Sequence, residues 1–220
     1  MKIDAIITGA TGMVGEGVLH ECLKHPDVTS VLVINRKQCG VEHPKLKEII
    51  LKDFFNVNEI ENQLSGYNAC FFCSGVSSVG MNADEYSRIT YDLTINFAKE
   101  LARLNPDMTF CYVSGAGTDS SEKGRIKWAR IKGKTENDLL ILSFKAAYMY
   151  RPAFIQPIIG LKNTYTIYKL LSPVITLLKK LLPAFICSLE ELGLSMINVV
   201  KFGHAQKIIE NKDISGLGNK

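Results

Sequence analysis

The sequence lacks the dense basic clusters that mark a nucleic-acid-binding protein. Its 220 residues carry 26 lysines and arginines against 22 acidic residues, a net charge of +4, and the lysines are scattered along the chain. Nucleic-acid-binding surfaces concentrate basic side chains on one face, often with interleaved aromatic residues. We therefore expect no nucleic-acid partner.

The sequence also has no pattern for a metal site or a disulfide framework. The four histidines, at positions 20, 25, 43 and 204, show no metal-ligand spacing, and we expect no metal. Three of the six cysteines lie inside the apolar runs NACFFCSG and FCYVSG, which is typical of buried small residues in a reducing compartment. Cys70 and Cys73 would point to opposite faces of a strand, so they cannot share a metal ion.

The start of the sequence passes directly into a strand pattern. The residues MKIDAIITGATG leave no room for a charged region, a separate apolar region and a cleavage site. On this basis we expect a cytoplasmic location.

The apolar stretch 164–187 is too interrupted to span a membrane. Its longest uncharged run, 170–178, is shorter than the ~20 residues of a spanning helix, and Pro173 and Pro183 break the stretch. Lysines at 169, 179 and 180 flank the apolar run, so an amphipathic contact with a membrane surface is an alternative. The other interpretations are a lid or wall over the cleft and a dimer contact, in a protein that is a monomer or a homodimer.

Short apolar runs alternate with helical patterns over the first 155 residues. The runs DAIITG, SVLVINR, KEIILKD, NACFFCSG, MTFCYVSG and AAYMYRP are predicted strands, and 13–24, 84–104 and about 125–143 have helical periodicity. Strands that are apolar throughout are typical of a parallel sheet covered on both faces. The order predicts an α/β protein with a doubly wound parallel sheet, the Rossmann fold.

This organisation predicts a single domain over residues 1–220, because no Gly/Ser-rich linker separates a second unit. We expect 1–155 to form a cofactor-binding core and 156–220 to be a helical tail that shapes the substrate cleft. Within the tail, Ser188 and Glu191 have the spacing of a capping box, which predicts the start of a final helix.

The segment TGATGMVGEGV follows the first predicted strand and opens the first predicted helix. Gly9, Gly12 and Gly15 stand three residues apart in it. Glycines at such a turn let the backbone approach a pyrophosphate, which then meets the free N–H groups and the dipole of the helix N-terminus. The flanking strand and helix make the pattern indicative of a dinucleotide site.

The second predicted strand ends in Asn35, Arg36 and Lys37. A site that prefers NAD(H) usually has an acidic residue here for the ribose 2′-hydroxyl, whereas a guanidinium beside a neutral residue suits a 2′-phosphate. We therefore expect NADP(H) to be preferred over NAD(H). The alternative is that Arg36 and Lys37 are solvated residues at a strand end.

Further cofactor contacts are expected after the third and fourth strands. Asp53 and Phe54 follow the third strand, where they could meet the adenine. Cys73, Ser74 and Gly75 end the fourth strand with small residues that leave space for the ribose and nicotinamide. Both stretches could equally be ordinary loops.

Several of these segments together resemble a known family. TGATGMVG, INR, YVSGAG and KGKTEND are similar to segments of the short-chain dehydrogenase/reductases, more narrowly of the small atypical NAD(P)-dependent epimerase-like members. The resemblance covers residues 1 to about 155 and continues less specifically through RPAFIQP and a helical tail. With the resemblance included, the expected cofactor-binding residues are Gly9, Thr11, Gly12, Met13, Val14, Gly15, Asn35, Arg36, Lys37, Asp53, Phe54, Cys73, Ser74, Gly75, Lys132 and Pro152.

The resemblance also implies a catalytic set. In the family a strand-end serine polarises the substrate, a tyrosine transfers the proton, and a lysine four residues later binds the nicotinamide ribose. Ser114 stands at the serine position, Lys132 at the lysine position and Trp128 at the tyrosine position. The alternatives are that Ser114 caps a turn and that Lys132 is a solvated lysine.

Trp128 changes the chemistry that this set can perform. An indole N–H donates a hydrogen bond, but it has no acceptor lone pair and does not titrate near neutrality, so it cannot be a general acid or base. Three alternatives remain. The proton comes from another group or from a water relayed by Lys132, the reaction needs no protein acid there, or the dinucleotide is bound without turnover.

Two functions are therefore compatible with the sequence. The first is an NADP(H)-dependent oxidoreductase or epimerase-like enzyme for a small carbonyl or hydroxyl substrate whose identity the sequence does not define. The second is a catalytically inactive dinucleotide-sensing or partner-regulating protein that retains only cofactor binding.

Overall fold

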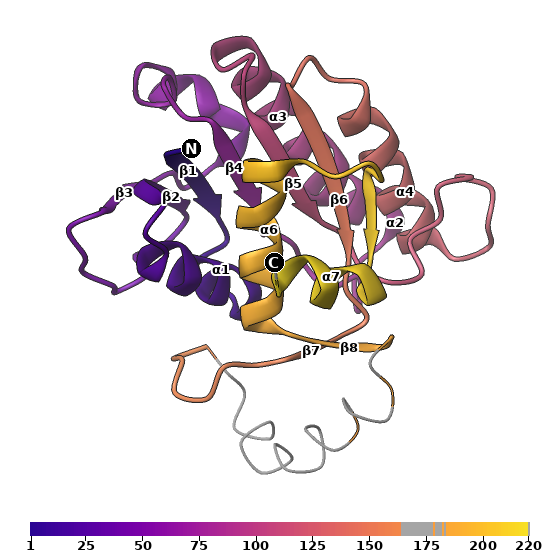
Figure 1. Ribbon diagram of the computed structural model, residues 1–220. Helices are drawn as coiled ribbons and strands as arrows, with labels where there is room; N and C mark the ends of the chain where they lie inside the picture. Colours follow the sequence, from indigo (N-terminus) through magenta and orange to yellow (C-terminus); the bar gives the residue numbers. More distant parts are fainter. Residues whose placement is uncertain (164–177, 179–181, 183, 220) are drawn as a thin grey trace.

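The structure is a computed structural model that describes residues 1–163, 178, 182 and 184–219 (Figure 1). The stretch 164–187 lies largely outside the described residues, and with it the alternatives of a membrane contact, a lid and a dimer contact. Among the residues described, no helix is long and apolar enough to cross a membrane.

The described residues form a seven-stranded parallel sheet in the order β3, β2, β1, β4, β5, β6, β9. Its strands are β1 (Ile3–Thr8), β2 (Val28–Asn35), β3 (Leu46–Ile50), β4 (Ala69–Phe72), β5 (Thr109–Val113), β6 (Ala146–Arg151) and β9 (Ile208–Glu210). The strand order reverses between β1 and β4, the switch point at which doubly wound sheets bind ligands. The predicted Rossmann fold is confirmed.

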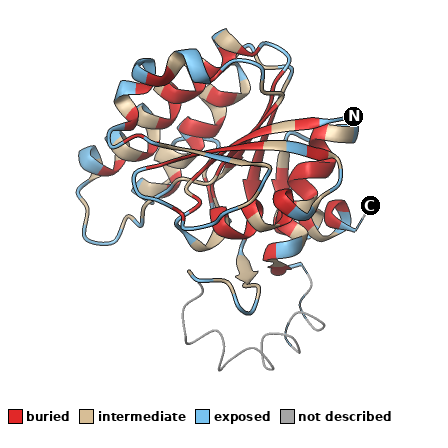
Figure 2. Ribbon diagram, turned by 90° about the vertical axis from the view of Figure 1, so that its left-hand side faces the viewer, coloured by how far each residue is buried: buried red, intermediate tan, exposed pale blue. Residues whose placement is uncertain are grey.

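Helices cover both faces of this sheet (Figures 1 and 2). One face carries α1 (Met13–Lys24), α6 (Leu189–Phe202) and α7 (Asn211–Gly218), and the other carries η1 (Phe54–Gln63), α3 (Leu93–Leu104) and α4 (Lys127–Leu140). Ile6 and Ile7 of β1 and Phe71 and Phe72 of β4 are all fully buried. Burial on both faces explains why these strands are apolar throughout.

The helix predicted over 84–104 consists of three consecutive segments. α2 (Ala83–Ser87) passes into η2 (Arg88–Asp92), a π-helical turn, which passes into α3. The apolar face of α3 is buried as expected, with Phe97 and Leu101 fully inaccessible. Single π turns inside helices are frequent at functional sites.

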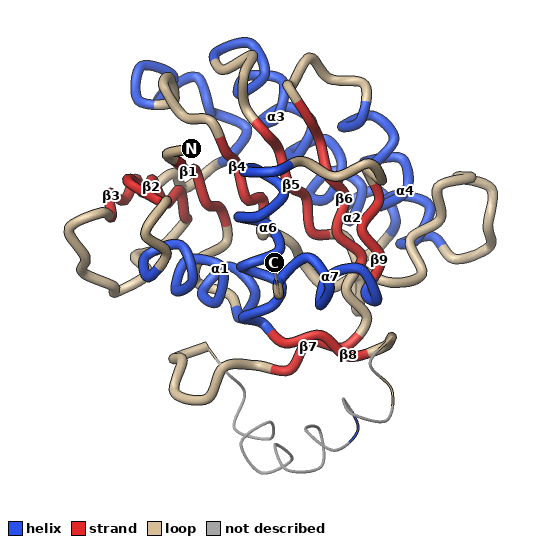
Figure 3. The backbone as a smooth tube through the Cα atoms, in the orientation of Figure 1, coloured by secondary structure: helices blue, strands red, loops and turns tan. Residues whose placement is uncertain are grey.

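The chain after residue 155 contributes strands as well as helices, which differs from the predicted helical tail. β7 (Phe154–Gln156) pairs with β8 (Ile186–Ser188) in a separate small sheet below the main one (Figure 3). β9 extends the main sheet beside β6. Each of these strands has three residues, too few for a period-two pattern to be recognised in the sequence. Residues 1–155 alone therefore do not complete the sheet.

α6 begins with the predicted capping box. Ser188 Oγ accepts a hydrogen bond from Glu191 N at 3.1 Å, and Glu191 Oε2 accepts one from Ser188 N at 2.7 Å. α6 then packs on α1 so closely that a Cβ on Gly17 would lie 2.1 Å from Cγ of Leu189. The capped helix thus joins the tail to the helix that follows the glycine loop.

Ser188→Ala should lower the free energy of unfolding by about 1 kcal/mol, because Glu191 N loses its acceptor. Urea denaturation followed by circular dichroism measures this. Ser65→Ala, at an exposed turn position, is the control and should change stability by less than about 0.5 kcal/mol. A loss for Ser188→Ala no larger than the control's would contradict the role assigned to the cap.

Candidate functional site

A pocket of about 450 Å³ opens at the carboxyl edge of the sheet, at the switch point between β1 and β4. Ligand sites in proteins commonly measure roughly 300–1,000 Å³. The residues that follow β1, β2, β3 and β4 line the pocket together with η1, η2 and the start of α3. The pocket therefore lies where the fold predicts a ligand.

The glycine loop leaves no room for side chains. Gly9 has a φ of +74°, and a Cβ on it would lie 2.8 Å from the backbone of Cys73, just after β4. A Cβ on Gly15 would lie 2.2 Å from the carbonyl oxygen of Gly9. Only glycine allows these two close backbone contacts. The first holds the loop against the end of β4, and the second holds the start of α1 against the loop.

α1 begins at this loop without a side-chain cap. Its N-cap residue is Gly12, which lines the pocket. Met13, Val14 and Gly15 form the first turn, whose N–H groups have no partner within the helix. These N–H groups and the positive end of the helix dipole are therefore available to an anion in the pocket.

Asn35 braces the glycine loop. Its side chain is 2 % exposed, Oδ1 accepts a hydrogen bond from Ala10 N at 3.0 Å, and Nδ2 donates one to Glu48 Oε1 at 3.3 Å. The neutral residue expected beside the guanidinium of Arg36 thus lines the pocket, but its polar atoms link the loop to β3.

Three cationic side chains line the pocket: Arg36 after β2, Lys52 after β3 and Arg88 at the start of η2. All three are exposed, and none is paired with a carboxylate in the part of the chain that the structure describes. Asp53 also lines the pocket, but its carboxylate accepts a hydrogen bond from Phe55 N at 3.0 Å. The lining therefore carries an excess of positive charge.

The end of β4 is tied to the end of β1. Ser74 N donates a hydrogen bond to Thr8 Oγ1 at 3.2 Å. Burial raises the pKa of the neighbouring Cys73 thiol to about 12. Cys73 is therefore neutral near pH 7 and unsuited to act as a nucleophile.

The residues that the family resemblance places at the catalytic positions surround the loop after β5. Lys132 Nζ donates a hydrogen bond to the carbonyl oxygen of Ser114. Burial lowers the pKa of the Lys132 ammonium, and the charge of Glu136 partly offsets that effect. The ring of Trp128 packs on Gly117, where a Cβ would lie 3.4 Å from Trp128 Cη2. Lys132 thus supplies a half-buried cation, and Trp128 supplies an apolar wall.

Pro152 lies at the same loop. Its carbonyl oxygen accepts a hydrogen bond from Ala116 N at 2.9 Å. A Cβ on Gly115 would lie 4.0 Å from both the Pro152 oxygen and Lys132 Nζ. The structure therefore brings Pro152 and Lys132 together.

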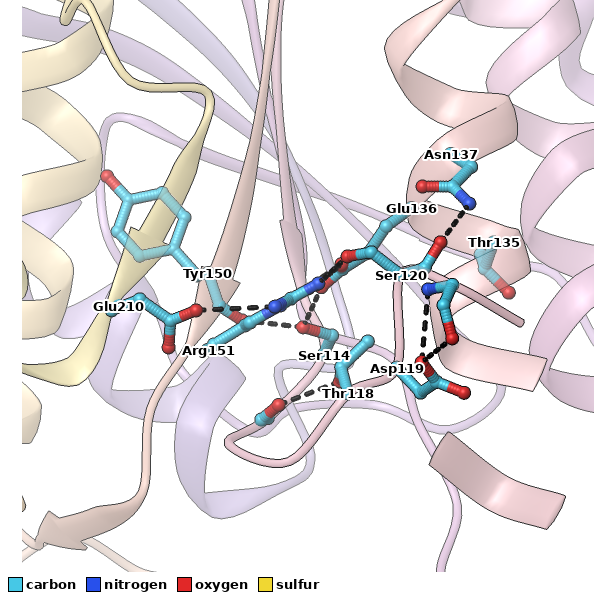
Figure 4. Close-up of polar contacts among 12 residues, drawn as sticks. Ser114, Thr118, Asp119, Ser120, Thr135, Glu136, Asn137, Tyr150, Arg151 and Glu210 are labelled. Atoms are coloured by element: carbon cyan, nitrogen blue, oxygen red, sulfur yellow. Dashed lines mark hydrogen bonds and ion pairs between the residues drawn. The ribbon is translucent and has the colours of Figure 1, made fainter. Parts of the chain in front are cut away.

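Ser114 follows β5 directly, as predicted, but its hydroxyl turns into a buried polar network rather than projecting toward a substrate (Figure 4). Its Oγ lies 2.5 Å from Glu136 Oε1 and 3.0 Å from the carbonyl oxygen of Tyr150. A hydroxyl has one proton, and both of these neighbours are acceptors. The hydroxyl is therefore not free to donate a hydrogen bond to a substrate carbonyl, because it already donates one to the buried Glu136 carboxylate.

Glu136 is fully buried and is balanced by Arg151. Arg151 Nε lies 3.1 Å from both carboxylate oxygens of Glu136, and Nη2 also bonds to that carboxylate. Arg151 reaches Ser120 Oγ at 2.5 Å and Glu210 Oε1 at 3.3 Å as well. A buried carboxylate is tolerated only with such paired and hydrogen-bonded partners. The network therefore fixes α4, β5, β6 and β9 relative to one another.

Most residues predicted to bind the cofactor line the pocket: Gly9, Thr11, Gly12, Asn35, Arg36, Asp53, Phe54, Cys73, Ser74 and Gly75. Met13, Val14 and Gly15 directly follow the lining residue Gly12 in the first turn of α1. Lys132 and Pro152 are not part of the lining and lie at the loop after β5. Lys37 is exposed and is not part of the lining.

Seven lining residues were not predicted from the sequence: Lys52, Phe55, Phe72, Val76, Arg88, Ile89 and Leu93. The pair of Glu136 and Arg151 was not predicted either. The sequence could have indicated a partner for Arg151, since an arginine that ends the apolar run AAYMYR needs a buried carboxylate. No sequence pattern could have placed Arg88 at the pocket, because its position depends on the packing of η2.

The sheet order, the glycine loop and the pocket at the switch point define a Rossmann-type dinucleotide-binding protein. The model of the NAD dependent epimerase/dehydratase family matches residues 5–125, more than half of the chain, and the chain belongs to this family. The matched region includes the glycine loop and Ser114 and ends before Trp128 and Lys132.

Curated relatives include Protein FMP52, mitochondrial, of Meyerozyma guilliermondii, which is 27% identical over 152 residues, 67% of this chain. The match spans 63% of that protein's own length. The protein of the same name from Saccharomyces cerevisiae is 24% identical over 160 residues, 72% of this chain and 67% of that protein. The expectation of a cytoplasmic location is wrong by this comparison, because these relatives are named as mitochondrial proteins.

Solved structures share the fold. The enzyme WbmG of Bordetella bronchiseptica, crystallised in complex with NAD and UDP, superposes with a TM-score of 0.69 at 13% sequence identity. The superposition covers 96% of this chain and 72% of that one. At this identity the likeness supports the fold alone.

Glu136→Ala should lower the free energy of unfolding by about 3–5 kcal/mol, because the buried Arg151 guanidinium loses its buried carboxylate partner and is left with the longer contact to Glu210. Thermal and urea denaturation measure the loss. Glu100→Ala, which removes a surface carboxylate paired with Arg103, is the control and should cost about 1 kcal/mol or less. Losses of equal size would contradict the structural role of the buried pair.

Proposed function

We propose that the protein binds NADP(H) in preference to NAD(H) and uses it in oxidoreductase or epimerase-like chemistry on a small carbonyl or hydroxyl compound. The observation that carries the proposal is the pocket at the switch point. There, a glycine loop without side chains and an uncapped helix N-terminus meet an excess of cationic side chains. Membership of the NAD dependent epimerase/dehydratase family supports a nicotinamide dinucleotide as the ligand.

The pocket residues fit the parts of such a cofactor. The first-turn N–H groups of α1, at Met13 and Val14, would hold the pyrophosphate. The rings of Phe54 and Phe55 offer apolar surface for the adenine. Arg36 would bind the 2′-phosphate, because a guanidinium makes charge-assisted hydrogen bonds to phosphate oxygens and this one has no acidic partner among the described residues.

Lys132 would hold the nicotinamide ribose. An ammonium has three N–H donors, and one of them is used on the Ser114 carbonyl oxygen. The other two remain for the ribose and for a substrate oxygen or a water that carries the proton. The bound nicotinamide would supply or accept the hydride. Trp128 would exclude bulk water from this end of the site and donate its single N–H.

A second candidate function is a dinucleotide sensor without turnover. Two features favour it: Trp128 stands where the family resemblance places a tyrosine, and the Ser114 hydroxyl donates its hydrogen bond to Glu136. The two roles that the family resemblance implies, a serine that polarises the substrate and a tyrosine that transfers the proton, are then both unfilled. Neither Trp128 nor Ser114 lines the pocket, so neither feature prevents the binding of a dinucleotide there.

Arg36→Ala should weaken NADPH binding about tenfold or more, since a hydrogen bond to a charged group contributes about 1.5–3 kcal/mol. The affinity for NADH should change little, because NADH has no 2′-phosphate. Isothermal titration calorimetry measures both affinities, with Arg103→Ala on α3 as the control. Equal losses for the two nucleotides would mean that Arg36 does not read the phosphate.

Turnover separates the two candidate functions. Wild-type protein is expected to oxidise NADPH with at least one member of a panel of aldehydes, ketones and sugar nucleotides. Trp128→Tyr should raise that rate by up to about 100-fold, because general acid catalysis contributes about 10²–10⁴-fold. Trp128→Phe, which restores no hydroxyl, is the matched control. Tight NADPH binding with no hydride transfer in either wild type or Trp128→Tyr would favour the sensor.

A further inference from the structure

We infer that Lys52 and Arg88 are further specificity-determining residues, and that they join Arg36 in binding a phosphomonoester on the adenosine ribose, the 2′-phosphate of NADP(H). The inference rests on the proposed function, because it concerns the same pocket. It adds two residues that come from neither the glycine loop nor the second strand.

The pairing of β2 with β3 brings Lys52 to the side of Arg36. Asn35 is the register partner of Ile50, and Leu51 N donates a hydrogen bond to the Asn35 carbonyl oxygen at 2.9 Å. Lys52 and Arg36 therefore leave the sheet together at its carboxyl edge, and both line the pocket. An anion bound near both side chains would interact favourably with each of the two charges.

Arg88 enters the pocket from a different element, the π-helical turn η2. Its guanidinium lies 5.1 Å from the centre of the Phe55 ring, and both residues line the pocket. A carboxylate partner would occupy the N–H donors of an arginine, whereas an aromatic ring orients the guanidinium by its flat face and leaves the donors at the edge free. Arg88 is therefore positioned for an anion that the protein itself does not provide.

A pyrophosphate has its own binding group in the pocket, separate from the three cationic side chains. The N-terminus of α1 already offers N–H groups for a pyrophosphate. Asp53, the acidic side chain in the lining, binds the backbone N–H of Phe55 and is not paired with any of the three cations. One more phosphate in the pocket accounts for Arg36, Lys52 and Arg88 together. Such a phosphate is present in NADP(H) and missing from NAD(H).

Calorimetric titration of the purified full chain with NADPH, NADH, 2′,5′-ADP and 3′,5′-ADP tests the inference. Lys52→Ala and Arg88→Ala should each weaken NADPH and 2′,5′-ADP roughly tenfold and leave NADH within about twofold. Arg88→Lys should recover only part of the loss, because lysine keeps the charge without the planar fork. Phe55→Leu should weaken NADPH more than NADH if the ring positions Arg88, whereas loss of an adenine contact alone would weaken both nucleotides equally.

Arg103→Ala is the control for an exposed arginine outside the pocket, and circular dichroism verifies that each variant is folded. Equal losses of NADPH and NADH in the Lys52 and Arg88 variants, or no loss, would overturn the inference alone. A selective loss of 3′,5′-ADP would also overturn it, because the cations would then read a 3′-phosphate. Wild-type protein that binds neither NADPH nor NADH would overturn the proposed function and the inference with it.

Discussion

The contact between the glycine loop and the end of β4 is the constraint on which the site depends. Gly9 lies so close to Cys73 and Gly15 so close to Gly9 that neither position can carry a Cβ. This packing sets the start of α1 at the strand-order reversal and directs its first-turn N–H groups to the pocket. The buried Asn35 reinforces the arrangement by linking Ala10 to Glu48. Backbone packing therefore sets the shape of the glycine-loop side of the pocket, and the cationic side chains add positive charge to its lining.

A second constraint controls the loop after β5. The buried carboxylate of Glu136 requires Arg151, and it also accepts the hydrogen bond of the Ser114 hydroxyl. The network thus makes the loop after β5 rigid, while it removes the hydroxyl that would polarise a substrate. Lys132 remains as the half-buried cation of this region, anchored on the Ser114 carbonyl oxygen. The proposed cofactor binding thus depends on the pocket, whereas proton transfer would depend on the loop after β5, and the structure supports the first more strongly.

Much of the fold follows from local patterns in the sequence. The apolar runs predicted six of the seven strands of the main sheet, and Ser188 with Glu191 predicted the start of α6. Three-residue strands such as β9 carry too little pattern to be recognised, and the π turn at Arg88 interrupts a helix without any break in periodicity. The glycine loop and the strand ends identified most of the pocket lining. Lys52 and Arg88 were missed because their place depends on strand register and on helix packing, and the Ser114 hydroxyl was misjudged because its partner Glu136 is distant in sequence.

If the protein binds NADP(H) as proposed, the cofactor lies along the pocket with its nicotinamide directed to Lys132 and Trp128. Trp128 is the only tryptophan in the chain, so its fluorescence reports on that end alone. The most direct test is a titration with NADPH in which Trp128 is excited and the emission of the dihydronicotinamide is recorded. Saturable quenching of Trp128 with sensitised dihydronicotinamide emission is expected, at lower concentrations for NADPH than for NADH. Saturable binding by calorimetry without energy transfer, or a preference for NADH, would contradict it.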